Sequence, residues 1–264
     1  MLSVAIVTVT YNAINSVRET IESVLIQDYA NMEYLIIDGA STDNTIKMVE
    51  SYSNRFAEKN IRFTVNSEPD SGIYDAMNKS LYRIDSDYVL FLNAGDVLTD
   101  SNTIRKIFCN LDYPLFDVIY GDFYAYSKPY IKKKKSYSPD MLRRGMICTH
   151  QAIFTKVSLL RERPYDTGYK MAADYDFYLD MYLKGKKFHY VAVPVVYFDI
   201  SGTSQKRARI TQNERLEIKL HYGCISNKEY NLNRKNIKWI CLRKRIISAL
   251  PKTIRFHSYD LIQR

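Results

Sequence analysis

The chain has 264 residues, 46% of them hydrophobic, which is enough for one large α/β domain with or without a short appendage. No apolar run approaches the ~20 residues that a membrane-spanning helix needs. The net charge of +9 is uneven, because residues 205–264 carry 15 Lys/Arg against 4 Asp/Glu while the part before them is nearly neutral. The scattered cysteines form neither a CxxC metal pattern nor a disulfide framework and favour a reducing cytoplasm: Cys109, Cys148, Cys224 and Cys241.

The first hundred residues alternate apolar strands with amphipathic helices. The strands are predicted at Leu2–Val9, Tyr34–Ile37, Phe63–Val65 and Tyr88–Leu92. The helices are predicted at Val17–Leu25, Ile46–Tyr52 and Ile73–Tyr82. Candidate N-caps for the second of these helices are Ser41, Thr42 and Asp43. This alternation indicates right-handed βαβ units and a Rossmann-like, mostly parallel sheet of the α/β class.

The remainder of the chain is less regular. Two strands are predicted around Gly121-Asp122, at Asp117–Tyr120 and Phe123–Tyr126, and the run Lys132–Lys135 suits a solvated loop or edge. A helix over Ala173–Leu183 and a strand over Phe188–Phe198 follow. A domain boundary is expected near 201–204, which leaves 205–264 as a basic helical C-terminal extension.

Four segments each end an apolar run with a small polar or acidic cluster: Thr8–Asn12, Asp38–Asp43, Ser67–Gly72 and Phe91–Asp96. In an open parallel sheet, ligands bind in the crevice beyond the carboxyl ends of the strands. Polar groups at every strand exit therefore predict one binding edge, and their chemistry suits a nucleotide sugar.

Asp96 follows a buried strand, where its carboxylate can ligate Mg²⁺ or Mn²⁺ that clamps a diphosphate. Gly95 would let the backbone approach that metal closely. A strand-ending turn, in which Asp96 caps a following helix, is an equal alternative. Asp38 can accept hydrogen bonds from a base or a ribose, although a turn aspartate in an Asp-Gly pair is the more common role.

Five further polar residues are candidates for the same cleft. Asp174 and Asp176 stand two apart at a helix start and do not share a face, so one can serve as a general base while the other caps or holds the helix. His150 can bind metal or sugar, or be a structural histidine. Asn78 and Lys79 could reach the cleft from their helix, or be solvated there.

Together these segments resemble the inverting glycosyltransferases of family 2, which have the GT-A fold, in particular bacterial enzymes of colanic-acid, capsule and O-antigen biosynthesis. The resemblance spans roughly residues 2–204 and rests on these segments: Val7–Asn12, Ile37–Thr45, Ser67–Lys79, Phe91–Asp96, His150–Phe154 and Ala173–Asp176. It implies a nucleotide-binding part over residues 1–98 and an acceptor-side part over residues 99–204.

The resemblance assigns the nucleotide-side residues as follows. Thr10 and Tyr11, with the adjacent Asn12, would line the nucleotide pocket. Asp38 would contact the base, usually uracil, and Asp70 would help to hold the nucleoside. The expected donor is therefore a UDP-sugar.

The resemblance also assigns the metal and the base. Asp96 matches the last acid of the family's DxD motif and would hold Mn²⁺ or Mg²⁺, while Asn93 or Ala94 replaces the first acid. Asp174 stands at the position of the catalytic base. The mechanism implied is a single displacement, in which Asp174 deprotonates an acceptor hydroxyl that attacks the anomeric carbon opposite the nucleoside diphosphate.

The basic tail interleaves apolar and basic residues over 235–256, which is typical of an interfacial membrane anchor. We therefore expect a peripheral protein at the inner face of the cell membrane that acts on a glycan or lipid-linked glycan. A helix packing on the domain or on a second subunit is the alternative. A nucleic-acid partner is disfavoured, because acids at the strand ends would repel phosphates. A non-catalytic nucleotide-sugar-binding protein and a nucleotidyltransferase remain as rival functions.

Overall fold

The computed structural model describes residues 2–109, 116–127, 130–200 and 207–237. Its central feature is one sheet with the strand order β3-β2-β1-β4-β8-β6-β9-β5, and β7 pairs with β6 beside this path. The strands are β1 (Val4–Thr10), β2 (Met32–Asp38), β3 (Arg62–Ser67), β4 (Tyr88–Phe91), β5 (Val97–Leu98), β6 (Val118–Ser127), β7 (Tyr130–Lys134), β8 (Ile153–Lys156) and β9 (Phe188–Asp199). The predicted α/β class is confirmed.

The first four strands are parallel, as the alternating pattern predicted. Their residues are buried on both faces in β1, β2 and β4, which explains the unbroken apolar runs. The register pairs Thr10 with Asp38, and Asp38 with Ser67, so these strands end at the same level. The polar clusters that follow them therefore emerge along one edge of the sheet.

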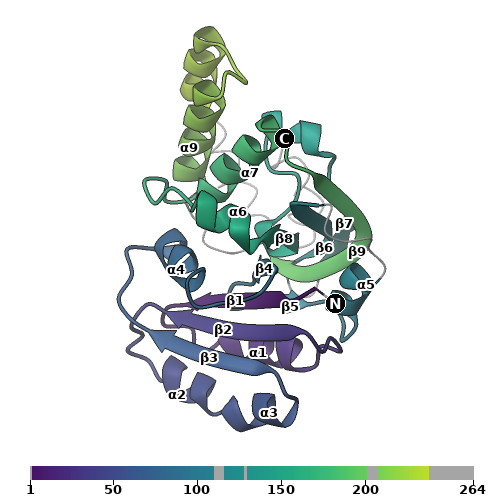
Figure 1. The fold of residues 1–264 in the computed structure, drawn as a ribbon. Coiled ribbons are helices and arrows are strands. Elements are labelled where there is room, and N and C mark those ends of the chain that lie inside the picture. Colours follow the sequence, from purple (N-terminus) through teal and green to yellow (C-terminus); the bar gives the residue numbers. More distant parts are fainter. Residues whose placement is uncertain (1, 110–115, 128–129, 201–206, 238–264) are drawn as a thin grey trace.

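Helices cover both faces of this parallel part, as Figure 1 shows for α2 and α3 on one side of β2 and β3 and for α4 on the other. The helices are α1 (Val17–Leu25), α2 (Thr45–Glu50), α3 (Ser53–Glu58) and α4 (Ile73–Ser80). The single helix predicted at Ile46–Tyr52 is shorter, and the separate α3 was missed. The cap position of α2 is Asn44, and Ser41 bonds to Asp38 instead. Of the predicted N-caps, Asp43 does accept a hydrogen bond from the helix start, from Thr45 N at 3.1 Å.

The second half of the sheet is mixed. Strand β8 runs antiparallel to both β4 and β6, whereas β9 runs parallel to β6. The two strands predicted around Gly121-Asp122 form one strand, β6, whose pairing with β9 shifts register at those two residues. A Cβ on Gly121 would lie 2.4 Å from the carbonyl oxygen of Val193, so this close approach requires glycine. The lysine-rich run belongs to β7 and its end, at an edge of the sheet, as expected.

The remaining helices surround the second half of the sheet: α5 (Thr103–Phe108), α6 (Val157–Glu162), α7 (Ala173–Leu183), α9 (Ala208–His221) and the short 3-10 helices η1 (Pro139–Arg143) and η2 (His150–Ala152). The foot of α9 lies beside α7, and its other end projects away from the sheet (Figure 1). None of the described helices combines the length and apolar character needed to traverse a bilayer. Most of the predicted anchor over 235–256, namely residues 238–256, lies outside the described residues.

Candidate active site

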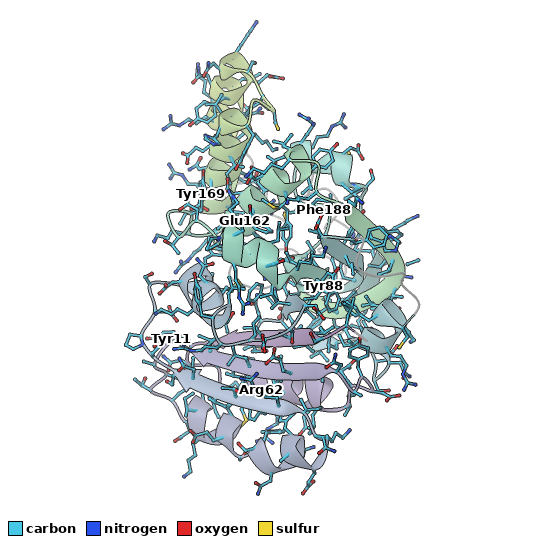
Figure 2. The ribbon with its side chains drawn as sticks, in the orientation of Figure 1. Tyr11, Arg62, Tyr88, Glu162, Tyr169 and Phe188 are labelled. Carbon is cyan, nitrogen blue, oxygen red and sulfur yellow. The ribbon has the colours of Figure 1, made fainter. Side chains whose placement is uncertain are left out.

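A cavity of about 880 Å³ opens at the carboxyl ends of β1 and β4 and extends to β7, α7 and α9. Figure 2 shows Tyr11 at the edge of the molecule where the parallel strands end, and Tyr169 near the foot of α9. Most of the predicted site residues line the cavity: Thr10, Tyr11, Asn12, Asp70, Asn93, Ala94, Gly95, Asp96, His150 and Asp174. Residues from separate strand ends are therefore brought together around one cavity.

Asp38 is not among the lining residues, because hydroxyl groups enclose its carboxylate. Its side chain is 0% exposed. Oδ1 accepts hydrogen bonds from Thr10 Oγ1 at 2.9 Å and from Ser41, while Oδ2 accepts from Ser67 Oγ at 2.8 Å. This carboxylate therefore ties the ends of three strands together, and it presents Thr10 to the cavity rather than itself.

Asn78 and Lys79 also lie outside the cavity lining. Only the start of α4 borders the cavity, through Tyr74 and the residue before it, and Asn78 is one helical turn further away. The Asn78 amide instead donates to Tyr165 O at 2.8 Å, and Lys79 Nζ donates to Pro69 O at 2.8 Å. The expectation that these two residues reach the cleft is not met.

Asp96 is a buried acid at the exit of β4. Its side chain is 6% exposed, and Oδ2 accepts a hydrogen bond from Gln151 Nε2 at 2.8 Å. Burial raises the pKa of Asp96 to about 7, although the nearby His150 lowers it. Gly95 has a φ of 102°, a conformation that a side chain would strain, and its N–H donates to Thr20 Oγ1. The turn thus aims a desolvated carboxyl group into the cavity.

The chemistry of this turn fits a hard divalent cation. Asn93 stands in the same turn as Asp96, and its Oδ1 is buried and has no hydrogen-bond partner among the described residues. This oxygen is a second candidate ligand for a cation. Mg²⁺ and Mn²⁺ prefer oxygen ligands, and such ions are bound through one or two protein carboxylates plus substrate phosphates. No group of three His, Cys, Asp or Glu suited to a metal occurs in the described part of the chain.

Asp174 lies at the start of α7 with its carboxylate held from several directions. Tyr74 Oη donates to Oδ1 at 3.0 Å, and His150 Nδ1 lies 3.2 Å from Oδ2. Burial raises the pKa of Asp174, but the hydrogen bond and charge of His150, with the charge of Arg215, outweigh it and leave the pKa below its ordinary value. The carboxylate is therefore ionised and able to accept a proton at neutral pH.

The neighbouring acid has a structural role, as the i, i+2 spacing allowed. Asp176 Oδ2 pairs with Arg163 Nη2 at 2.5 Å, and Arg163 Nε pairs with Asp180 Oδ2 at 2.7 Å. Asp176 is not among the residues that line the cavity. The two acids thus divide into one that faces the cavity and one that fixes α7.

Several residues that line the cavity were not predicted. They are four cations, two acids and a set of neutral groups, among them Lys134, Lys135, Lys170, Arg215, Glu19, Asp199, Gln151 and Tyr126. The lysine run was noticed only as an edge of the sheet. Arg215 lies on α9, beyond the expected domain boundary, and no local pattern connects it to Asp174. Such residues meet only through long-range packing.

The model of the family described as glycosyl transferase family 2 matches residues 5–173. The PGL/p-HBAD biosynthesis glycosyltransferase of Mycobacterium tuberculosis is 28% identical over 175 residues, which cover 66% of this chain and 67% of that protein.

Two solved structures share the fold. S. aureus TarS 1–349 in complex with UDP has a TM-score of 0.65 at 18% identity, covering 96% of this chain and 82% of that one. The mannosyltransferase PcManGT from Pyrobaculum calidifontis, in complex with GDP-Man and Mn²⁺, has a TM-score of 0.66 at 16% identity, covering 96% and 77%. The predicted GT-A architecture is confirmed, and the binding-protein and nucleotidyltransferase alternatives lose their support. The chain belongs to glycosyl transferase family 2 and is a glycosyltransferase.

Proposed function

We propose that the protein transfers a sugar, with inversion, from a UDP-sugar to a hydroxyl of a growing, lipid-linked bacterial surface glycan. One observation carries this proposal: the cavity contains an ionised carboxylate, Asp174, and the oxygens of Asp96 and Asn93, with His150 between them. An inverting displacement needs a base for the acceptor and a separate site for the leaving diphosphate.

The nucleotide would lie along the ends of β1 and β4. Tyr11 is 67% exposed at the cavity and offers a ring for stacking on a base. Thr10, Asn12 and Asp70 provide polar atoms beside it. The complexes of TarS with UDP and of PcManGT with GDP-Man support a nucleotide-sugar donor. Asp38 would act on the base indirectly, by fixing Thr10.

Asp96, with Asn93 and the backbone of Ala94 and Gly95, would hold Mn²⁺ or Mg²⁺. The Mn²⁺ in the PcManGT complex and the unpartnered Asn93 oxygen support this assignment. A bound cation supplies charge stabilisation for the departing diphosphate.

Asp174 would accept the proton of the acceptor hydroxyl as the oxygen attacks the anomeric carbon. The bond from that carbon to the diphosphate oxygen breaks in the same step, so the electron pair leaves with the nucleotide and the configuration inverts. His150 and Tyr74 would orient the carboxylate during this transfer.

The basic tail supports the proposed acceptor and the proposed location. We place the glycosyltransferase domain at residues 1–204 and the basic extension at 205–264, although α9 of that extension also reaches the cavity. The extension's positive charge would attach the protein to an anionic membrane surface, next to a lipid-linked acceptor of the colanic-acid, capsule or O-antigen type. The alternative is that the tail packs on a second subunit.

Thermal stabilisation by a panel of nucleoside diphosphates and nucleotide sugars, with and without Mn²⁺, tests the donor and the metal. A ligand at ~100 times its dissociation constant stabilises the fold by ~2.7 kcal/mol. We expect a metal-dependent shift with UDP compounds, whereas a shift with GDP compounds alone would overturn the donor assignment. Transfer to acceptor-lipid extracts, followed by NMR of the new linkage, then tests inversion.

A further inference from the structure

The charges that line the cavity are segregated along the chain. All the lysine and arginine residues in the lining come from its second half: Lys134, Lys135, Lys170 and Arg215. Within the described residues, the part of the chain up to Asp96 contributes acids but no lysine or arginine to the lining, namely Glu19, Asp70 and Asp96. The second half also contributes two acids, the base Asp174 and Asp199, of which Asp199 raises the pKa of Asp96 through its charge and therefore lies near it. The cations of the cavity thus all come from the acceptor-side part of the chain and from α9.

A chain of contacts orders the groups from one end to the other. Asn93 Nδ2 lies 3.3 Å from His150 Nε2, and His150 Nδ1 lies 3.2 Å from Asp174 Oδ2. Arg215 lies near the same helix start, with its guanidinium 6.0 Å from the ring centre of Tyr175, the residue after Asp174, and its positive charge lowers the pKa of the Asp174 carboxyl group. Arg215 therefore adjoins the base, whereas Asn93 adjoins the nucleotide end. An acceptor hydroxyl at Asp174 would bring its neighbouring substituents close to Arg215.

Two of these cations are held in place together. Glu214 accepts hydrogen bonds from Lys170 N and Met171 N, both at 2.8 Å, which ties the loop before α7 to α9. The Arg215 guanidinium lies 6.0 Å from the centre of the Tyr175 ring. Its Nε is buried and has no hydrogen-bond partner among the described residues. Such a donor is satisfied by an anionic oxygen.

We propose that the cations in the cavity lining, Lys134, Lys135, Lys170 and Arg215, bind an anionic group, a phosphate or a carboxylate, on the acceptor. This inference rests on the proposed function and adds the chemical class of its acceptor. The donor diphosphate is the competing anion, but it belongs at the Asp96 turn, on the far side of His150. The exposed ring of Tyr137, which also lines the cavity, would support the sugar that carries the charge.

The test compares matched charged and neutral probes by ligand-observed NMR titration, with the full chain in Mn²⁺, both with and without saturating UDP. Methyl glucuronide against methyl glucoside tests a carboxylate, and glycerol 1-phosphate against glycerol tests a phosphate. We expect one charged probe to bind about tenfold more tightly than the matched neutral probe, because a tenfold difference in affinity is what one hydrogen bond to a charged group contributes. The preferred probe identifies which anion the subsite takes.

Lys135→Gln and Lys170→Gln should each reduce that preference without changing the dissociation constant of UDP. Both lysines are exposed, so these variants should fold even if Arg215→Gln does not. Lys59→Gln, an exposed lysine that is not in the cavity lining, removes the same charge as a control and should change nothing.

Three results would overturn the proposal. One is equal binding of charged and neutral probes. Another is weaker UDP binding in the lysine variants, which would assign the cations to the diphosphate. The third is a variant-sensitive preference for UDP-glucuronate over UDP-glucose, which would put the anion on the donor. Failure of UDP to bind at all would instead refute the proposed function, and the titrations without UDP would still report on the anion site.

Discussion

The imidazole of His150 and the carboxylate of Asp174 form the central contact of the cavity, with Nδ1 3.2 Å from Oδ2. The other ring nitrogen, Nε2, lies 3.3 Å from the amide Nδ2 of Asn93. A neutral ring with its proton on Nδ1 donates to Asp174 and accepts from the Asn93 amide nitrogen at Nε2. Both ring nitrogens are thus used within the protein, and a metal at His150 would have to displace Asn93.

Asp174→Asn should lower turnover by about 10²–10⁴-fold, because the amide cannot accept the acceptor's proton. The dissociation constant of UDP with Mn²⁺ should not change, since Asp174 is assigned to the acceptor. Steady-state kinetics and calorimetry measure the two quantities. Asp176→Asn is the matched control: it removes a carboxylate paired with Arg163 and should reduce thermal stability but keep turnover. Unchanged turnover in Asp174→Asn would remove this residue from the role of base.

His150→Phe should lower kcat while leaving the KM of the donor unchanged, because the ring positions the base and does not contact the nucleotide. The variant also loses the hydrogen bond and charge that lower the pKa of Asp174. Burial then dominates and the pKa rises, so the acid limb of the pH–rate profile should move to higher pH. A weaker Mn²⁺ affinity with an unmoved pH profile would instead make His150 a metal ligand.

The nucleotide half of the site could be predicted from the sequence because its determinants are local. An apolar run followed by Asn93, Gly95 and Asp96 predicts both a buried strand and the polar turn at its carboxyl end. Asn78 and Lys79 illustrate the limit, since a helical pattern does not show how far the helix axis runs from the cavity. Asp38 lies in the predicted place, but three neighbouring hydroxyls enclose it, and only the strand register brings them together.

The acceptor half was less predictable because its contacts are distant in sequence. Gly121 separates two apolar runs that suggested two strands, yet a register shift against β9 keeps them in one. The backbone N–H of Lys170 bonds to Glu214, the residue before Arg215, although Glu214 stands 44 residues from Lys170 in the chain. No periodicity encodes such a contact.

Arg163→Met should destabilise the fold, because it leaves the carboxylate of Asp176 without its partner and removes one of the two cations that pair with Asp180, the other being Lys184. Their side chains are 5% and 10% exposed, so unpaired charges there are unfavourable. We expect a loss of about 2 kcal/mol, less than for a fully buried pair, because Arg163 is itself 25% exposed. Urea unfolding measures this loss. The double variant with Asp176→Asn should lose less than the sum of the single variants, and strict additivity would contradict the assigned pairing.

Asp96→Asn should stabilise the protein in the absence of metal while abolishing metal-dependent UDP binding. Burial raises the pKa of Asp96 from 3.8 to about 7, so the folded state binds a proton more tightly than the unfolded state. Stability therefore falls as the pH rises between these two values, and above them the ionised carboxylate costs the fold roughly 4 kcal/mol at most. The asparagine cannot ionise, so the variant does not lose this stability.

Thermal unfolding with a chelator should show the gain in stability of Asp96→Asn at about pH 8 and no gain at about pH 4. A gain of equal size at both pH values would mean that side-chain shape, and not ionisation, is responsible. A loss of stability at the higher pH would mean that the Asp96 carboxylate stabilises the turn, so that its burial has a structural reason other than metal binding.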